Sequence, residues 1–425
     1  MPFLGMRGSG DFTVTGQRPE NWREMVLWLY PNGHAPLTAL LAKLKSEKTD
    51  DPIFHWFQQE LPDQIGAVTG VFGGTNLSDA YAAAVVGDTF YVKMSAANAA
   101  KFNVSHQVML VINNLPSTRL TAKVTVAPVI NGASSYITCI LLEADGSSTK
   151  GGAIHTAAGS TNASLLVIGS VNPEGGTSPA SLIYDPNELS SYTQIFRNSL
   201  DQTRTAMKTR LRTGDQVKEA KRQALEMHSI EQEKAYWFSA LSVRTGANNK
   251  PERTTRGIRN YLTTNVSDFS TSTSATWAAG GKAFLDAYLE QLFRYGNTEK
   301  IAFCGSGALM GIQQMVEADG DMTITPGIQA YGIKVVTLNT VFGTLHLKLH
   351  PLFTLLAPLR YSMGILDPPH LVYRFVDDTK YLPNRQANDL DGEKSEFLTE
   401  AGLEVHFEKA HGWLDGIGLN GTLSP

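Results

Sequence analysis

The chain has 425 residues, more than one ordinary hydrophobic core holds, so its length favours two or more packed units. Charged residues make up 18% of it, the net charge is −4 and glycine occurs 38 times, a composition typical of a folded protein rich in strands and turns. Two cysteines, Cys139 and Cys304, exclude a disulfide-stabilised secreted scaffold. Without a run of about 18 apolar residues or a signal-peptide core, we expect neither a membrane span nor secretion.

The first 62 residues are expected to form an N-terminal arm with short helices. Leucines at helical spacing follow Pro36, and Pro52 stands where a helix often begins, which predicts a second helical piece over 53–60. The arm also carries large aromatic residues that it is too short to bury by itself. We expect these residues to pack on their own chain or to anchor the arm on neighbouring subunits, and the candidate anchors are Trp22, Trp28, Trp56 and Phe57.

Residues 63–192 have few charges and are rich in small residues and valine. Alternating apolar residues predict strands over 89–94, 107–112, 121–129 and 136–142. Asn-Gly and Asp-Gly pairs between them favour the positive φ of hairpin turns. We therefore expect a β-rich extended insertion, built either as a small barrel or as a tongue of two to four strands.

The strongest helix signal runs from Asp215 to about Leu241. Thr213 and Gln216 match a capping box, and an apolar stripe follows at helical spacing. With a rise of ~1.5 Å per residue this helix would be ~40 Å long, which few compact globular domains need.

The remainder of the chain mixes helices and strands, so the predicted fold class is α+β. Apolar faces predict helices over 282–294 and 308–316. Strands are expected over 301–304, 333–338, 344–349, 361–366, 371–375 and 403–406.

Charge is distributed unevenly along the chain. Residues 197–259 contain 14 Lys and Arg against 7 Asp and Glu, whereas residues 367–425 contain 11 acids against 5 bases. Such regions pair with each other within or between copies, face a polyanion, or are simply solvated. The candidate inter-subunit or genome-facing basic residues are Arg204, Lys208, Arg210, Arg212, Arg253, Arg256 and Arg259.

No motif in the chain assembles into a catalytic or metal-binding site. Gly305–Gly311 lies between a short strand and a helix, as a dinucleotide loop does, but its glycine spacing is one residue too long. We expect a tight strand-to-helix turn there instead. His346 and His350 have no Asp, Glu or Cys close by in sequence, so we expect core or interface histidines rather than metal ligands. The sequence predicts no enzymatic activity, no cofactor and no metal.

A series of short motifs lies in the region of the long helix and in the second half of the chain: Thr193-Gln194-Ile195-Phe196, Ile230 to Phe238, Thr255-Arg256-Gly257-Ile258, Leu366-Asp367-Pro368, Glu400 to Val405 and His411-Gly412. In content and order this series resembles the major capsid (major head) proteins of tailed bacteriophages, an HK-ninety-seven-like family. The resemblance covers about residues 180–419 and extends to the first 180 only in architecture.

The resemblance implies an HK-ninety-seven-like capsid fold. Its implied parts are an N-terminal arm over 1–62, an extended β-rich loop over 63–192, a peripheral domain with a long spine helix over 193–262, an axial domain over 263–370, and C-terminal strands over 371–425 that return to the peripheral domain.

The resemblance also implies that the chain assembles with itself, as hexamers and pentamers, into an icosahedral shell enclosing double-stranded DNA. Contact with the DNA would be non-specific. Portal, scaffold or decoration proteins are the other implied partners, no membrane is involved, and the protein would belong to the virion and assemble in the host bacterial cytoplasm. Two alternatives are an encapsulin-like nanocompartment shell and, more remotely, a nucleotide-binding oxidoreductase based on the Gly305–Gly311 loop.

Overall fold

The computed structural model describes residues 35–81, 85–112, 119–145, 163–209, 215–272, 276–319, 323–330 and 333–419. Trp22, Trp28, Arg210 and Arg212 of the predicted sites lie outside these ranges. The chain divides into two compact units: residues 59–187, here called the barrel unit, and the residues on either side, here called the main unit. Within the described ranges, no helix has the length and apolar character needed to cross a membrane.

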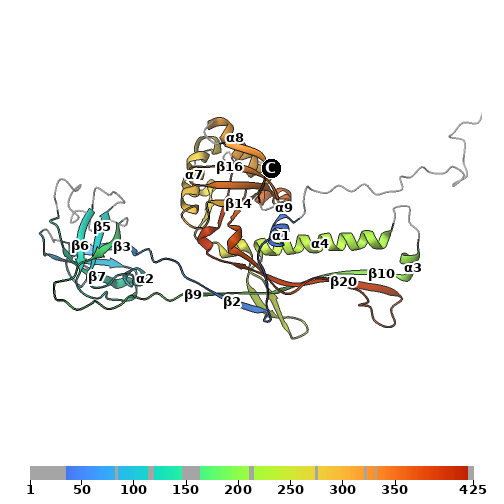
Figure 1. The fold of residues 1–425 in the computed structure, drawn as a ribbon, viewed down its shortest axis with the longest axis horizontal. Coiled ribbons are helices and arrows are strands. Elements are labelled where there is room, and N and C mark those ends of the chain that lie inside the picture. The colour runs from blue at the N-terminus through green and yellow to red at the C-terminus, as the bar shows by residue number, and fades with distance from the viewer. Residues whose placement is uncertain are drawn as a thin grey trace, which may run out of the picture. The chain divides into compact units, whose positions relative to one another are not determined.

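The barrel unit is a closed barrel of six strands (Figure 1). In spatial order these are β3 (Ile65–Phe72), β4 (Thr89–Met94), β7 (Ser135–Leu141), β6 (Arg119–Val124), β5 (His106–Ile112) and β8 (Ala163–Ser170), with the short helix α2 (Ala96–Ala99) after β4. Strict alternation in β7 buries every second side chain, as a strand with one face in the core requires. The β-rich insertion is therefore a barrel and not a tongue.

The first sheet of the main unit has four strands. Their order is β1 (Ser46–Lys48), β19 (Leu371–Leu382), β20 (Gly392–Val405) and β10 (Gln194–Thr203), with β1 parallel to β19 and the other pairs antiparallel. The spine helix α4 (Gln216–Phe238) packs against β10 and β20 (Figure 1). Asp215 caps this helix by accepting from the backbone N–H groups of Val217 and Lys218, whereas Thr213, on which the predicted capping box depends, lies outside the described residues.

The described part of the segment before the barrel unit, residues 35–58, contains helix α1 (Pro36–Leu41) and strands β1 and β2 (Ile53–Gln58). Helix α1 begins at its proline, as predicted. The predicted helical piece over 53–60 is wrong, because this segment is strand β2, which pairs with β9 (Asn187–Tyr192). Burial alternates along β2 with the period of two that its aromatic and β-branched residues favour.

The second sheet of the main unit has seven strands. Their order is β13 (Val266–Asp268), β21 (Gly412–Asp415), β18 (Met363–Leu366), β14 (Glu299–Cys304), β17 (Thr344–Leu349), β16 (Ile333–Asn339) and β15 (Thr323–Ala330). On β14, Ala302 and Cys304 face one apolar cluster, while Ile301 and Phe303 face another. The first cluster contains helices α7 (Trp277–Leu292) and α8 (Ser306–Asp319), and the second contains the end of α4, α5 (Ile258–Tyr261) and α9 (Pro351–Leu355). Helices thus cover both faces of this sheet.

Shorter elements complete the main unit. Helix α3 (Arg204–Lys208) follows β10, and α6 (Phe269–Ser272) follows β13. Strands β11 (Ser242–Thr245) and β12 (Pro251–Thr254) form a separate hairpin between the spine helix and α5. Helices and strands in these proportions give the α+β fold class expected from the sequence.

Candidate assembly surfaces

Two neighbouring residues of the predicted arm behave in opposite ways. Trp56 is 7% exposed and packs against Phe54, Tyr261 and His406 of its own chain. The expectation that Trp56 anchors on a neighbouring subunit is therefore wrong, because its own core buries it. Phe57 points to the other side of β2 and is 69% exposed, so it stays a candidate contact.

A buried glutamate fixes the base of the arm on the spine helix. Glu233 of α4 accepts hydrogen bonds from the backbone N–H groups of Leu37 and Thr38 at 2.8 and 2.7 Å. Its carboxylate also contacts His350 Nε2 at 2.8 Å, and both side chains are fully buried. Burying a carboxylate is costly unless such partners compensate it, so this tie makes α1 an integral part of the core.

The two histidines considered as metal ligands have separate surroundings. His350 lies in the aromatic cluster of Trp237, Phe303 and Phe353, and is a core histidine as expected. His346 Nδ1 lies 3.3 Å from the hydroxyl of Thr337. In the part of the chain that the structure describes, no three His, Cys, Asp or Glu side chains gather as a metal site would require.

Polar side chains also join the spine helix to the four-stranded sheet. His228 contacts Asn198 on β10 at 2.5 Å and Thr399 on β20 at 2.7 Å, and Gln232 donates to the same threonine at 3.0 Å. Burial lowers the pKa of His228, although the nearby Glu231 carboxylate acts to raise it. The seam therefore contains a neutral histidine at neutral pH.

A buried lysine lies where the two sheets of the main unit meet. Lys300 is fully buried and donates to the carbonyls of Tyr295 and Ala410 at 3.0 and 2.6 Å. The Asp367 carboxylate is 3.9 Å away and accepts two further hydrogen bonds from Asn297. Burial lowers the pKa of Lys300 to about 8, although Asp367 raises it.

The polar groups around Lys300 are hydrogen-bonded to further residues. These residues come from three chain segments that run between the two sheets. The Asp367 backbone N–H donates to His411 Nδ1, and burial, with Lys300 beside it, lowers the pKa of His411 to about 3. Asn265 donates to the carbonyls of Lys409 and His411. Residues 255–265, 366–371 and 405–412 are thus tied together at one place.

Some of the charged residues in the basic and acidic regions already form ion pairs within their own chain. Arg204 pairs with Asp391 at 2.7 Å, and Asp201 pairs with Lys394 at 3.2 Å. These ion pairs form because β10 of the basic region lies beside β20 of the acidic region. Internal pairing therefore accounts for part of the charge separation seen in the sequence.

The other basic candidates lie near the hairpin and on α3. Arg256 binds the Asn260 carbonyl and lies over the ring of Tyr261, while Arg259 lies over the ring of Trp413. Arg253 is half-buried on β12, and Lys208 is exposed in the last turn of α3. The structure brings Arg253, Arg256 and Arg259 into one region of the chain and leaves Arg204 and Lys208 at the far end of β10.

The Gly305–Gly311 turn is a packing device, as the sequence predicts. A Cβ on Gly305 would lie 2.3 Å from the Arg360 carbonyl oxygen, and one on Gly311 would lie 2.6 Å from the backbone of Gly418. Real Cβ atoms do not approach backbone this closely, so these glycines allow α8 to pack against the segments around it.

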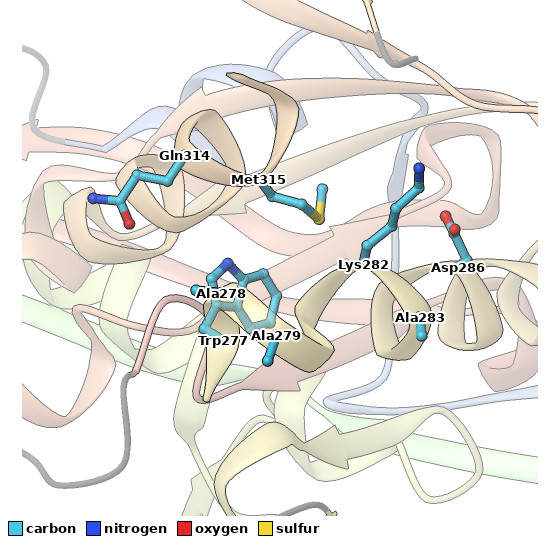
Figure 2. Close-up of a pocket in the computed structure, with 8 residues that line it drawn as sticks. All are labelled: Trp277, Ala278, Ala279, Lys282, Ala283, Asp286, Gln314 and Met315. Carbon is cyan, nitrogen blue, oxygen red and sulfur yellow. The ribbon is translucent and has the colours of Figure 1, made fainter. Parts of the chain in front are cut away.

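A cleft of about 410 Å³ lies between α7 and α8. Figure 2 shows Lys282 and Asp286 one turn apart on α7, with Gln314 and Met315 on α8 across the cleft. The indole of Trp277 lines it too, but already donates to the Gly311 carbonyl at 2.9 Å. Small alanine side chains make the rest of the wall, so the cleft is an apolar recess with a charged rim.

Comparisons with known proteins point to one family. The model of the SU10 major capsid protein family matches residues 8–418. A curated relative, the "Major capsid protein" of Pseudomonas phage PaMx41, is 29% identical over 231 residues, which is 53% of this chain and 55% of that protein. The chain thus matches about half the length of this relative.

Solved structures of similar fold include the capsid of a native GTA particle and the SrpI encapsulin of Synechococcus elongatus PCC 7942. The first has a TM-score of 0.45 at 8% identity over 97% of this chain and 99% of that chain. The second has a TM-score of 0.38 at 12% identity over 57% of this chain and 78% of that chain. The family match spans nearly all of the described residues, and on that match the chain belongs to the SU10 major capsid protein family.

Proposed function

We propose that this chain is the shell-forming subunit of a tailed-bacteriophage virion, and that its copies assemble as hexamers and pentamers into an icosahedral shell around double-stranded DNA. The family match over residues 8–418 carries this proposal. Within the main unit, residues 193–262 serve as the peripheral domain and residues 263–370 as the axial domain. Of the C-terminal residues, β19 and β20 return to the sheet of the peripheral domain, whereas β21 joins the seven-stranded sheet of the axial domain, so the expectation that all strands of 371–425 return to the peripheral domain is wrong for β21. Portal, scaffold or decoration proteins are further partners, and assembly takes place in the host bacterial cytoplasm.

The surface of the main unit suits a protein that binds copies of itself. Phe57, Val341 and Leu355 are each more than two-thirds exposed, on segments that are far apart in the sequence. Scattered apolar groups of this kind become buried when many contacts form at once, and permanent assemblies bury about 2,000 Å² or more at each interface. Contact with DNA would be electrostatic and non-specific, through basic residues such as Lys208.

Purification of the expressed full-length chain followed by negative-stain microscopy tests the proposal. We expect closed particles of uniform diameter, and a monomer that stays monomeric at every concentration would contradict the proposal. Nuclease-protected nucleic acid inside particles from an infected host would support the enclosed genome. A shell that contains protein cargo and no DNA would favour the encapsulin-like alternative, and saturable nicotinamide binding would revive the oxidoreductase.

A further inference from the structure

A second cleft, of about 280 Å³, lies between α1, the spine helix and β19. Its lining includes Gln232 and Tyr236 from the helix, and Tyr373, Phe375, Asp378 and Thr379 from the strand. All of these elements belong to the main unit, and α1 is fixed there by Glu233. The cleft is therefore a built feature of the fold rather than a gap between loosely placed segments.

The strand that supplies the carboxylate is irregular at that point. The register of β19 against β20 shifts between Phe375 and Asp377, and again between Asp377 and Lys380. Such bulges turn side chains away from the direction that regular alternation would give them, and they are common beside functional sites. Here they accompany an aspartate, Asp378, on the rim of the cleft.

Asp378 is exposed and forms no ion pair with the described residues. Its carboxylate accepts from the backbone N–H of Thr379 at 2.8 Å and from the Tyr373 hydroxyl at 3.4 Å. Nearby Lys380 pairs with Asp377 instead, and Lys221 lies over the ring of Tyr381. Among the residues that the structure describes, no lysine or arginine lines the cleft.

The remaining walls are aromatic and hydroxylic. Tyr373 stacks on Phe375 with ring centroids 5.8 Å apart and meets Tyr236 edge to face at 6.3 Å. The hydroxyl of Tyr236 is buried without a hydrogen-bond partner within ordinary distance among the described residues. Burial and the neighbouring Tyr373 raise the pKa of Tyr236 well above its usual value, so its hydroxyl stays neutral and able to accept a hydrogen bond.

These groups select one class of ligand. A carboxylate, aromatic faces and hydroxyl oxygens together attract an ammonium or guanidinium group and repel phosphate or carboxylate. We propose that the cleft receives a lysine or arginine side chain of a second copy of this chain. The chain has suitable groups, because Lys208, Lys234 and Lys250 are exposed and have no ion-pair partner within the described ranges.

This contact rests on the proposed self-assembly, and a matched pair of variants tests it. Asp378→Asn removes the charge in the cleft, whereas Asp377→Asn removes a charge one residue away that does not line it. The critical subunit concentration for assembly, measured by sedimentation at several salt concentrations, should rise about tenfold for D378N and less than twofold for D377N. Asp378→Glu, which keeps the charge, should restore part of the loss.

Each outcome separates the two proposals. If the wild-type chain forms no particles, the proposed function fails; if it assembles and D378N behaves like D377N, the cleft contact fails. If D378N loses its native tryptophan fluorescence, the variant cannot test the contact. The wild-type chain is then assembled in the presence of butylammonium, which competes with the lysine or arginine side chain for the cleft. Butylammonium chloride should then inhibit assembly more than the same concentration of sodium chloride, and equal effects of the two salts would overturn the contact.

Discussion

The barrel unit and the main unit bury polar groups in opposite ways. Among the described residues of 59–187 the buried polar side chains are two serines, Ser105 and Ser135, and the core cluster is apolar. The main unit buries several ionisable groups inside its cores: His228, Glu233, Lys300, His350, Asp367, Glu404 and His411. The difference follows from how each unit is built along the chain.

The barrel is built from one continuous stretch of chain, closes on itself and needs only apolar side chains to fill it. The main unit instead assembles segments that lie more than a hundred residues apart. Glu233 joins α1 to the spine helix across 196 residues, and Lys300 reaches the Ala410 carbonyl across 110. Apolar packing alone would allow such segments to slide, whereas a buried charge is satisfied in a single arrangement.

The tryptophans allow this comparison to be tested on the whole chain. Each of the six lies outside residues 59–187, so tryptophan fluorescence reports only on the main unit. Hydrogen exchange read by mass spectrometry reports on the barrel amides separately.

Removing the buried lysine should give the largest effect. Lys300→Ala leaves Asp367 buried without its cation and two carbonyls without a donor, which costs about 3–5 kcal/mol of unfolding free energy. Urea unfolding followed by tryptophan fluorescence measures the loss. Lys93→Ala, on the partly exposed wall of the barrel, serves as the control and should leave the fluorescence midpoint unchanged. A loss below about 1 kcal/mol in Lys300→Ala would mean that the cluster relaxes or admits water.

A cavity in the barrel should destabilise the barrel and spare the main unit. Leu110→Ala removes a fully buried side chain, and large-to-small changes of this kind cost about 2–5 kcal/mol. Exchange of the barrel amides should therefore become faster while the fluorescence midpoint stays in place. If both quantities move together, the two units unfold cooperatively and the contrast drawn between them is wrong.

Mild acid should weaken the main unit more than the barrel. The folded pKa of His411 is lowered to about 3, so the unfolded chain binds more protons as the pH falls below about 6.5. Stability from this group is present above that pH and decreases as the pH falls toward 3, by about 2 kcal/mol between pH 7 and pH 5. The lowered pKa of His228 acts in the same direction. His411→Gln should flatten the fluorescence-detected pH profile, and a profile of unchanged slope would exclude His411 as its source.

The smallest effect is expected at the exposed ion pair between the basic and acidic regions. Arg204 and Asp391 are both about two-thirds exposed, and pairs of this kind contribute ~1 kcal/mol or less. Arg204→Ala should therefore leave the fluorescence midpoint nearly unchanged while altering the salt dependence of assembly. An effect as large as that of Lys300→Ala would show that the surface pair is more than a solvated contact.

The spacing of residues along the chain predicts those elements that form through contacts between residues close in sequence. The long helix, the strands of the barrel and the tight turn at Gly305 follow from the spacing of apolar residues and glycines, and the structure contains them. Residues 53–60 were mispredicted because Pro52 suggests a helix start, while the alternation that identifies a strand extends over only six residues.

The contacts that close the barrel and tie the main unit could not be predicted from spacing. Closure pairs β3 with β8, whose residues are about a hundred apart in sequence, and a tongue would show the same alternation. The charges of Glu233 and Lys300 suggest a solvated surface until their partners are known. Asp378 beside the cleft lies where the register of β19 against β20 shifts, and register shifts leave no signature in composition or periodicity.

The pairing of β2 with β9 has a consequence for engineering. The Thr193 N–H donates to the Pro52 carbonyl at 2.9 Å, which places the start of β2 beside the end of β9, so the two strands run antiparallel. The chain therefore leaves the main unit at Gln58 and returns at Glu188 about one strand spacing, roughly 5 Å, from where it left. Domains with adjacent termini tolerate insertion and exchange. Residues 59–187 therefore form a cassette, and another small domain with closely spaced ends can take their place without lengthening either strand.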